Sequence, residues 1–351
     1  MKQPRIRGYD ILRVILICMI VVIHSSCKLL WKLESSSNSS LLMLEIYSLC
    51  VCAVPCFFIL SGSLLLRANG VITQRELFSY RIKKQFIPFV LWSMIYVMLR
   101  CMYGTEIFSI SAFFNLIKEP AYSQFWFMYT LLAIYLLLPF LQILTQNMNR
   151  RQFEYLLILW GIFSCITHVL NVYVPDFYIS PHIDLVVCEG YLGFFLLGNY
   201  LQRYTKEITW KKASLLFILG IVITSVTVFC EWTFSDADVA MGISRACSDY
   251  LFPGAILSAI GLYTLFQNYP FKESAIAHKI ASLSDLTLGV FYVHMIILTF
   301  IEKFIITNES SIILTLIKAV ITIVLSFLVS YLLSIVPIIN KYLVLNIHKR
   351  D

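Results

Sequence analysis

The sequence predicts an all-α integral membrane protein that crosses the bilayer about ten times. Of its 351 residues, 59% are hydrophobic and only 13% are charged, whereas soluble domains carry about 25% charged residues. The apolar residues also fall in repeated blocks of about 20, the length that a helix needs to cross the hydrocarbon core. These two observations exclude a soluble globular protein. They also mean that the net charge of +7 is not a nucleic-acid-binding signal.

The first apolar block follows three basic residues, as the apolar core of a signal peptide would. No small-x-small cleavage site follows it, and Arg13 and His24 lie inside it. We therefore expect a retained first span rather than a cleaved signal.

Ten apolar blocks separated by polar breaks predict ten helices. Pro55 and the pair Ser61-Gly62 interrupt the second block, and small residues there let backbones or a ligand approach closely. We find no internal repeat and no loop long enough for a soluble domain, so we expect one polytopic domain over 1–351 with no appended soluble domain. The predicted spans are 11–30, 41–66, 85–104, 125–145, 153–173, 186–203, 213–232, 249–267, 286–304 and 311–338.

The distribution of basic residues predicts that both termini are cytoplasmic. With that orientation, 19 of the 27 Lys and Arg residues lie on the cytoplasmic side and six on the opposite side. The excess recurs from loop to loop, as the positive-inside rule requires. The remaining two, Arg13 and Lys318, fall within spans.

The ten cysteines lie mostly inside the predicted spans, and they form no CxxC pair and no metal-ligand pattern with histidines. We interpret them as small buried hydrophobes and expect no metal site.

Arg13 and His24 share one face of the first helix, because eleven residues complete about three turns and place them about 16 Å apart along its axis. Asp10 lies one turn before Arg13 and can pair with it. Arg13 is either an interfacial residue that snorkels or a ligand contact. His24 is either a structural histidine or a group that faces a cavity, where a neutral imidazole suits general-base work or proton transfer.

Further polar and aromatic residues lie on other predicted spans. Trp126 stands at the outer end of the fourth span, where an aromatic belt would also explain it. Tyr292 and His294 lie near the middle of the ninth span, which runs in the same direction as the first. Two histidines at mid-membrane, His24 and His294, therefore indicate a shared polar cavity.

The residues of the first and second spans resemble a known family. Arg13, ten residues and then His24 resemble the R/K-x10-H signature of membrane acyltransferase family 3. "FFILSG" (57–62) is similar to the FFxxSG element of its second helix, and "RIKKQFIPF" (81–89) is similar to its basic segment ending in a proline.

Later elements follow in the same order. "FWFMYTLLAIYLLLP" (125–139) is similar to the family's W-F…Y…P helix, and "LGVFYVHMII" (288–297) to its G-x-Y-x-x-H stretch. The resemblance covers almost the whole chain. Within the family, the proportions of the loops are most similar to those of members that O-acetylate the enterobacterial common antigen.

The resemblance implies an O-acyltransferase, with acetyl as the expected group, in the bacterial cytoplasmic (inner) membrane. The donor would be cytoplasmic acetyl-CoA or another short acyl-CoA. The acceptor would be a hydroxyl of an extracytoplasmic or lipid-linked cell-surface glycan. The expected partners are thus acyl-CoA, the glycan, the bilayer and separate glycan-assembly proteins, with no nucleic acid.

The resemblance also implies roles for nine residues. His24 would be the general base, and Arg13, oriented by Asp10, would hold the donor's phosphates. Arg81 and Lys84 would add attraction for the donor, although both also serve as positive-inside anchors. The implied set is catalytic His24 and Arg13; donor-binding Arg13, Arg81, Lys84 and Ser61; and acceptor-binding or oxyanion candidates Tyr292, His294, Trp126 and Asp10, with Ser61 a further oxyanion candidate.

Two other functions fit the composition. A transporter, either proton-coupled or moving amino acids as racemase-fused relatives of this membrane unit are expected to do, also uses buried histidines and broken helices. Against it, no matched half-repeats with interrupted helices are visible in the sequence. A non-catalytic scaffold leaves the register of Arg13 and His24 unexplained.

Overall fold

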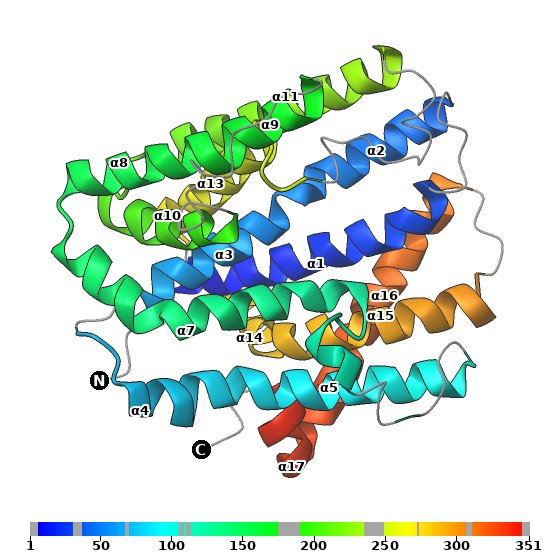
Figure 1. The fold of residues 1–351 in the computed structure, drawn as a ribbon. Coiled ribbons are helices and arrows are strands. Elements are labelled where there is room, and N and C mark those ends of the chain that lie inside the picture. Colours follow the sequence, from blue (N-terminus) through cyan, green and yellow to red (C-terminus); the bar gives the residue numbers. More distant parts are fainter. Residues whose placement is uncertain are drawn as a thin grey trace.

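The computed structural model describes residues 6–30, 37–66, 70–104, 109, 114–174, 190–234, 249–271, 274–306 and 311–345. Every regular element in these residues is helical, which confirms the predicted all-α class. Figure 1 shows the arrangement. The helices are α1 (Arg7–Leu30), α2 (Asn38–Val51), α3 (Ala53–Leu65), α4 (Gln74–Glu76), α5 (Lys83–Met102), α7 (Trp126–Asn147), α8 (Arg150–Trp160), α9 (Thr167–Tyr173), α10 (Tyr191–Tyr204), α11 (Trp210–Phe234), α13 (Pro253–Asn268), α14 (Ala275–Leu283), α15 (Thr287–Phe304), α16 (Ile312–Ile335) and α17 (Pro337–Ile339).

Eight helical segments within the described residues are long and apolar enough to cross a membrane. The other two predicted spans correspond to α10, with 14 residues, and α13, with 16 residues. Both are shorter than the roughly 20 residues of a full crossing. Residues 186–189, where the sixth predicted span begins, lie outside the described residues. The count of ten spans and the cytoplasmic termini therefore stay predictions.

The helices alternate in direction across the bundle. The ends of α3 and α7 and the starts of α4 and α8 lie together at the left of Figure 1. This alternation is what consecutive crossings require. It also brings the basic segments that flank these ends to one side of the molecule.

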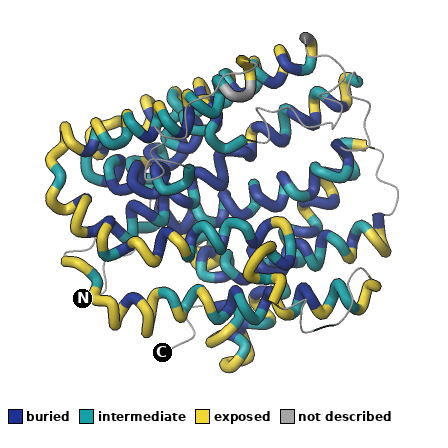
Figure 2. Tube along the Cα trace, in the orientation of Figure 1, coloured by how far each residue is buried: buried dark blue, intermediate teal, exposed yellow. Residues whose placement is uncertain are grey.

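The centre of the bundle is α1, with other helices on every side of it (Figure 1). Figure 2 shows it buried along most of its length, whereas the outer helices expose many residues. The exposed side chains are largely apolar, for example Leu215 and Phe140, each 67% exposed. Apolar side chains suit an outer surface that faces lipid, since lipid tails offer no hydrogen bonds.

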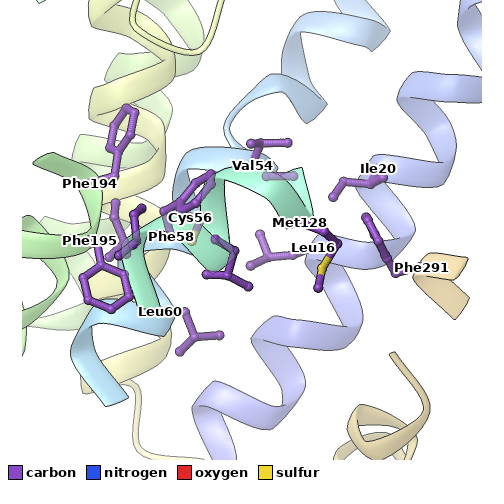
Figure 3. Close-up of a cluster of buried hydrophobic side chains, with 14 of the residues drawn as sticks. Leu16, Ile20, Val54, Cys56, Phe58, Leu60, Met128, Phe194, Phe195 and Phe291 are labelled. Carbon is purple, nitrogen blue, oxygen red and sulfur yellow. The ribbon is translucent and has the colours of Figure 1, made fainter. Parts of the chain in front are cut away.

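The second predicted span is broken near Pro55, as its sequence indicates, whereas α3 continues without interruption through Ser61 and Gly62. The break lies at Cys52, between α2 and α3, and Pro55 occupies the first turn of α3. Proline has no N–H to donate, so it interrupts the helical hydrogen bonds at this point. The break turns α3 into the core, where Phe58 packs among side chains of α1, α7 and α10 (Figure 3).

Gly62 and Gly198 let α3 and α10 pack with their backbones in close approach. A Cβ added at Gly62 would lie 1.8 Å from the carbonyl oxygen of Phe195, and one at Gly198 would lie 1.9 Å from that of Ile59. Small residues at helix contacts allow this packing in membrane proteins. Gly62 therefore serves the α3–α10 contact, while the neighbouring Ser61 is free to line a cavity on the other side of α3.

Candidate functional site

A cavity of about 310 Å³ lies alongside α1, between α3, α7 and α15 and the first turn of α5. Four residues of α1 line it: Arg13, Ile17, Ile20 and His24. Their spacing of three and four residues is that of a single helix face. The cavity therefore extends along the α1 face that the sequence predicts, with Arg13 near one end and His24 near the other.

At the first end, Arg13 is held by a buried carboxylate. Its Nη1 donates to Oδ1 of Asp10 at 3.2 Å, and the Arg13 side chain remains 34% exposed. Asp10 is 2% exposed and also accepts a hydrogen bond from the hydroxyl of Ser284 at 3.3 Å. Since Ser284 precedes α15, the carboxylate joins α1 to that segment. Asp10 does not line the cavity; it orients the guanidinium that does.

A second cation, Lys84, lines the same end of the cavity from the first turn of α5. Arg81 does not line it, because its side chain is exposed beside the ring of Tyr80. The charges of Arg13 and Arg81 both act on Tyr135, whose side chain is on the cavity wall. This end of the cavity thus presents the guanidinium of Arg13 and the ammonium of Lys84 together with the carboxylate of Asp285, and its two cations can bind an anionic group.

At the other end, His24 lies beside a second histidine. Its ring centroid is 5.4 Å from that of His294, with the planes tilted by 40°. His24 is half-buried and makes no hydrogen bond to the described residues, so its nitrogens are accessible from the cavity. His294 is fully buried. Its Nδ1–H donates to the carbonyl oxygen of Val290 at 3.0 Å, and its Nε2 has no partner among the described residues.

Tyr292 is buried away from the cavity. Its ring stacks on Trp92, with centroids 5.7 Å apart and planes 7° apart, and its hydroxyl has no hydrogen-bond partner in the described part of the chain. Neither Tyr292 nor His294 lines the cavity, so in this arrangement neither reaches a reacting group in it. Ser61 lines the cavity and is thus the better placed of the three hydroxyl or imidazole candidates for an oxyanion donor.

Three residues at the start of α7 and before α13 form part of the wall: Gln124, Trp126 and Tyr250. Trp126, which an aromatic belt would have turned toward lipid, instead stacks on Tyr250 with centroids 5.8 Å apart and planes at 23°. Of these three, Trp126 alone is part of a motif that the sequence shows. Gln124 and Tyr250 belong to no recognisable sequence motif. The only sequence feature that could have indicated a role in the site is that each is a polar or aromatic residue at the edge of a predicted span.

The structure thus brings five predicted residues to one cavity: Arg13, His24, Ser61, Lys84 and Trp126. Asp10 lies behind Arg13 and His294 beside His24, so both contact the cavity residues without lining the cavity. Arg81 and Tyr292 lie off its wall. The catalytic and binding roles of all nine remain predictions. Within the described residues, no three His, Cys, Asp or Glu side chains are grouped closely enough to hold a metal ion.

A second cavity, of about 530 Å³, lies between α9, α11 and α13. Glu231 lines it and accepts a hydrogen bond from the hydroxyl of Tyr173 at 2.5 Å. Its other lining residues are mostly apolar, and it shares none of them with the first cavity. None of the nine predicted site residues lines this second cavity.

Among known protein families, the acyltransferase 3 family, described as an acyltransferase domain, matches residues 6–335. The match includes Arg13, His24 and every other residue on the described wall of the cavity up to Phe291. No curated protein and no solved structure matches the chain.

Proposed function

This chain belongs to the acyltransferase 3 family, and we propose that it is a membrane O-acyltransferase. It moves an acyl group, acetyl as the expected one, from cytoplasmic acyl-CoA to a hydroxyl of an extracytoplasmic or lipid-linked cell-surface glycan. Its membrane is the bacterial cytoplasmic membrane, with both termini in the cytoplasm. Within the family, we propose an O-acetyltransferase of the kind that modifies enterobacterial common antigen.

The observation that carries this proposal is that Arg13 and His24 line one cavity from the same face of α1. A guanidinium recognises phosphate through paired N–H donors, and an imidazole takes a proton near neutral pH. The two lie about 16 Å apart along the helix axis. This separation suits a donor with phosphates at one end and a reactive thioester at the other.

At the cytoplasmic end, Arg13 and Lys84 bind the phosphates of acyl-CoA. Asp10 holds the guanidinium in place through its contact at 3.2 Å. The pantetheine arm then lies along the face of α1, past Ile17 and Ile20, and its thioester reaches His24.

At His24, the chemistry is a transesterification. The glycan hydroxyl oxygen attacks the thioester carbonyl carbon, and its proton passes to the imidazole of His24. The tetrahedral intermediate then expels the CoA sulfur, which takes that proton, and leaves the O-acyl ester. The hydroxyl of Ser61 stands on the same wall as a donor for the oxyanion.

The proposal is tested with purified protein in lipid nanodiscs and acetyl-CoA labelled in the acetyl group. Glycans extracted from cells that lack this gene serve as the acceptor. We expect label in the glycan and release of free CoA. A transporter or a scaffold leaves the label on CoA, and this result would overturn the proposal. Mass spectrometry of surface glycans from cells with and without the gene identifies the acyl group.

A further inference from the structure

The cavity contains a buried polar atom that the proposed donor chemistry does not use, the side-chain oxygen of Gln124. Gln124 is 3% exposed and lines the cavity just before the first turn of α7. Its Oε1 has no hydrogen-bond partner among the described residues. Buried amide oxygens are nearly always paired, so an unpaired one on a residue that lines a cavity points to a ligand.

The hydrogen bonds of Gln124 determine which atom of the amide is unpaired. The hydroxyl of Tyr96 donates its proton to the carbonyl oxygen of Tyr292 at 2.7 Å. Because that hydroxyl has one proton, its oxygen accepts from the amide of Gln124, at 3.2 Å. The NH₂ group is thus directed at Tyr96, and the oxygen is the atom that remains without a partner among the described residues. A ligand must therefore present an O–H or N–H to it.

The surroundings of Gln124 favour a sugar as that ligand. Trp126 and Tyr250 line the same cavity with their ring centroids stacked 5.8 Å apart, and the ring of Tyr191, tilted by 41°, lies 5.0 Å from that of Trp126. The negative faces of aromatic rings attract weakly positive C–H groups, such as those on one face of a pyranose. Aromatic walls with a single well-placed hydrogen-bond acceptor are also typical of small-molecule sites.

The position of these residues separates them from the donor's phosphates. Trp126 is the first residue of α7, Gln124 precedes it by two residues, and Tyr135, nine residues after Trp126 on the same helix, lies within range of the charge of Arg13. Gln124 and Trp126 therefore lie at the His24 end, about 13 Å away along α7. A group bound there stands next to the base, opposite the cationic end.

We propose that Gln124, Trp126 and Tyr250 form the acceptor subsite of the enzyme. The amide oxygen of Gln124 accepts a hydrogen bond from a ring hydroxyl near the one that is acylated, and the aromatic pair packs on the face of the pyranose. The acceptor is then a hydroxylated sugar ring rather than an alcohol on a lipid chain. This inference rests on the proposed function.

The test measures KM separately for the glycan extract and for acetyl-CoA, using the full-length protein in nanodiscs. We expect Gln124→Leu to raise the KM for the glycan about tenfold, the value of one buried hydrogen bond, while the KM for acetyl-CoA stays within about twofold. Trp126→Ala should do the same, and Trp126→Phe should recover most of the loss.

Gln142→Leu is the matched control. Gln142 lies on the same helix and is also 3% exposed, but both ends of its amide are paired, with Leu65 and Ile72, and it does not line the cavity. We expect it to lower thermal stability without changing either KM. If Gln124→Leu fails to fold, the Trp126 variants test the acceptor subsite by the same comparison of the KM for glycan with the KM for acetyl-CoA.

Two results would overturn the inference. One is a raised KM for acetyl-CoA with an unchanged KM for glycan, which assigns Gln124 to the donor's pantetheine amides. The other is that the KM for glycan and the KM for acetyl-CoA both stay unchanged in the variants. In either case transfer by the wild-type protein still supports the proposed function, whereas a wild-type protein that transfers no label contradicts the function itself.

Discussion

His24 is the residue on which the proposed chemistry depends most. It lies beside His294, and it makes no hydrogen bond to the described residues that would explain it as structural. An ionisable side chain at this depth is costly unless it faces a cavity or a partner, and it faces the cavity. A structural histidine would instead be fully paired.

We expect His24→Ala to lower the rate of acyl transfer by a factor of about 10²–10⁴, the usual contribution of a general base. The protein should stay inserted and folded, because the change removes no hydrogen bond within the described residues. His278→Ala is the control, since this histidine is exposed and outside the cavity. Transfer by His24→Ala at the wild-type rate would exclude His24 as the base.

Arg13 contributes two properties to the proposed site: a positive charge and a planar pair of N–H donors. Arg13→Lys keeps the charge but loses the planar geometry, so we expect a partial rise in the KM for acetyl-CoA. Arg13→Leu should raise that KM further, since it also removes the cation 3.2 Å from the buried carboxylate of Asp10. Steady-state kinetics in acetyl-CoA ranks the variants. If Arg13→Leu matches the wild type, the phosphate role is wrong.

At the scale of the elements, the α3–α10 contact holds one wall of the cavity in place. Ser61 faces the cavity while Gly62, its neighbour, lies against the backbone of α10. The wall therefore depends on the absence of a side chain at residue 62.

We expect Gly62→Ala to destabilise the protein by about 1–3 kcal/mol, as overpacking of a tight contact does. Its Cβ would stand 1.8 Å from the carbonyl oxygen of Phe195. Gly161→Ala is the control, because a Cβ there meets nothing within 4 Å. Thermal unfolding in detergent measures both. Equal stabilities would show that α3 and α10 are not held as described.

A buried ion pair joins α15 to α16 near their connection. Nζ of Lys318, which is fully buried, lies 2.7 Å from Oε1 of Glu302, and Nζ of Lys28 lies 3.8 Å from Oε2 of the same carboxylate. This pairing explains how a lysine is tolerated in the first third of the apolar helix α16.

Glu302→Ala should lower the stability by about 3–5 kcal/mol, because it removes the carboxylate beside a buried ammonium. Combining it with Lys318→Leu should restore part of the loss, since the charge is then removed as well. A double variant no more stable than Glu302→Ala would contradict this account.

At the scale of the whole molecule, the direction of the bundle in the membrane sets which substrate enters from which side. The cationic end of the cavity must face the cytoplasm if acyl-CoA is the donor. The distribution of basic residues predicts this orientation, with 19 of them on that side.

Labelling of introduced cysteines tests the orientation of the protein in the membrane. A membrane-impermeant maleimide should label Lys118→Cys in intact cells, and should label Lys206→Cys only after the membrane is opened. Both lysines lie outside the candidate spans and are exposed. The unsubstituted protein is the control for its native cysteines. The reverse pattern would place the cationic end outside and exclude cytoplasmic acyl-CoA as the donor.

Much of this architecture is local in origin and could be predicted from the chain. Blocks of apolar residues decide where helices cross, because an unpaired backbone cannot enter lipid. The break in the second span follows from Pro55, and the shared face of Arg13 and His24 follows from helical geometry. The family resemblance rests on these same local features, and the match over residues 6–335 confirms it.

The limits of sequence-based prediction lie at contacts between helices. Trp126 could equally have faced lipid, and Gln124 and Tyr250 carried no signal, because which face of α7 turns inward depends on its neighbours. Tyr292 and His294 belong to the same helix as residues that line the cavity, yet neither of them lines the cavity.

The sequence by itself determined that this is a polytopic helical protein with a basic and an acid–base group on one face of its first helix. Only the tertiary structure decided that a single cavity joins them and which residues of other helices complete its wall. The physical reason is that helix formation depends on neighbours along the chain, whereas a cavity is defined by side chains far apart in sequence.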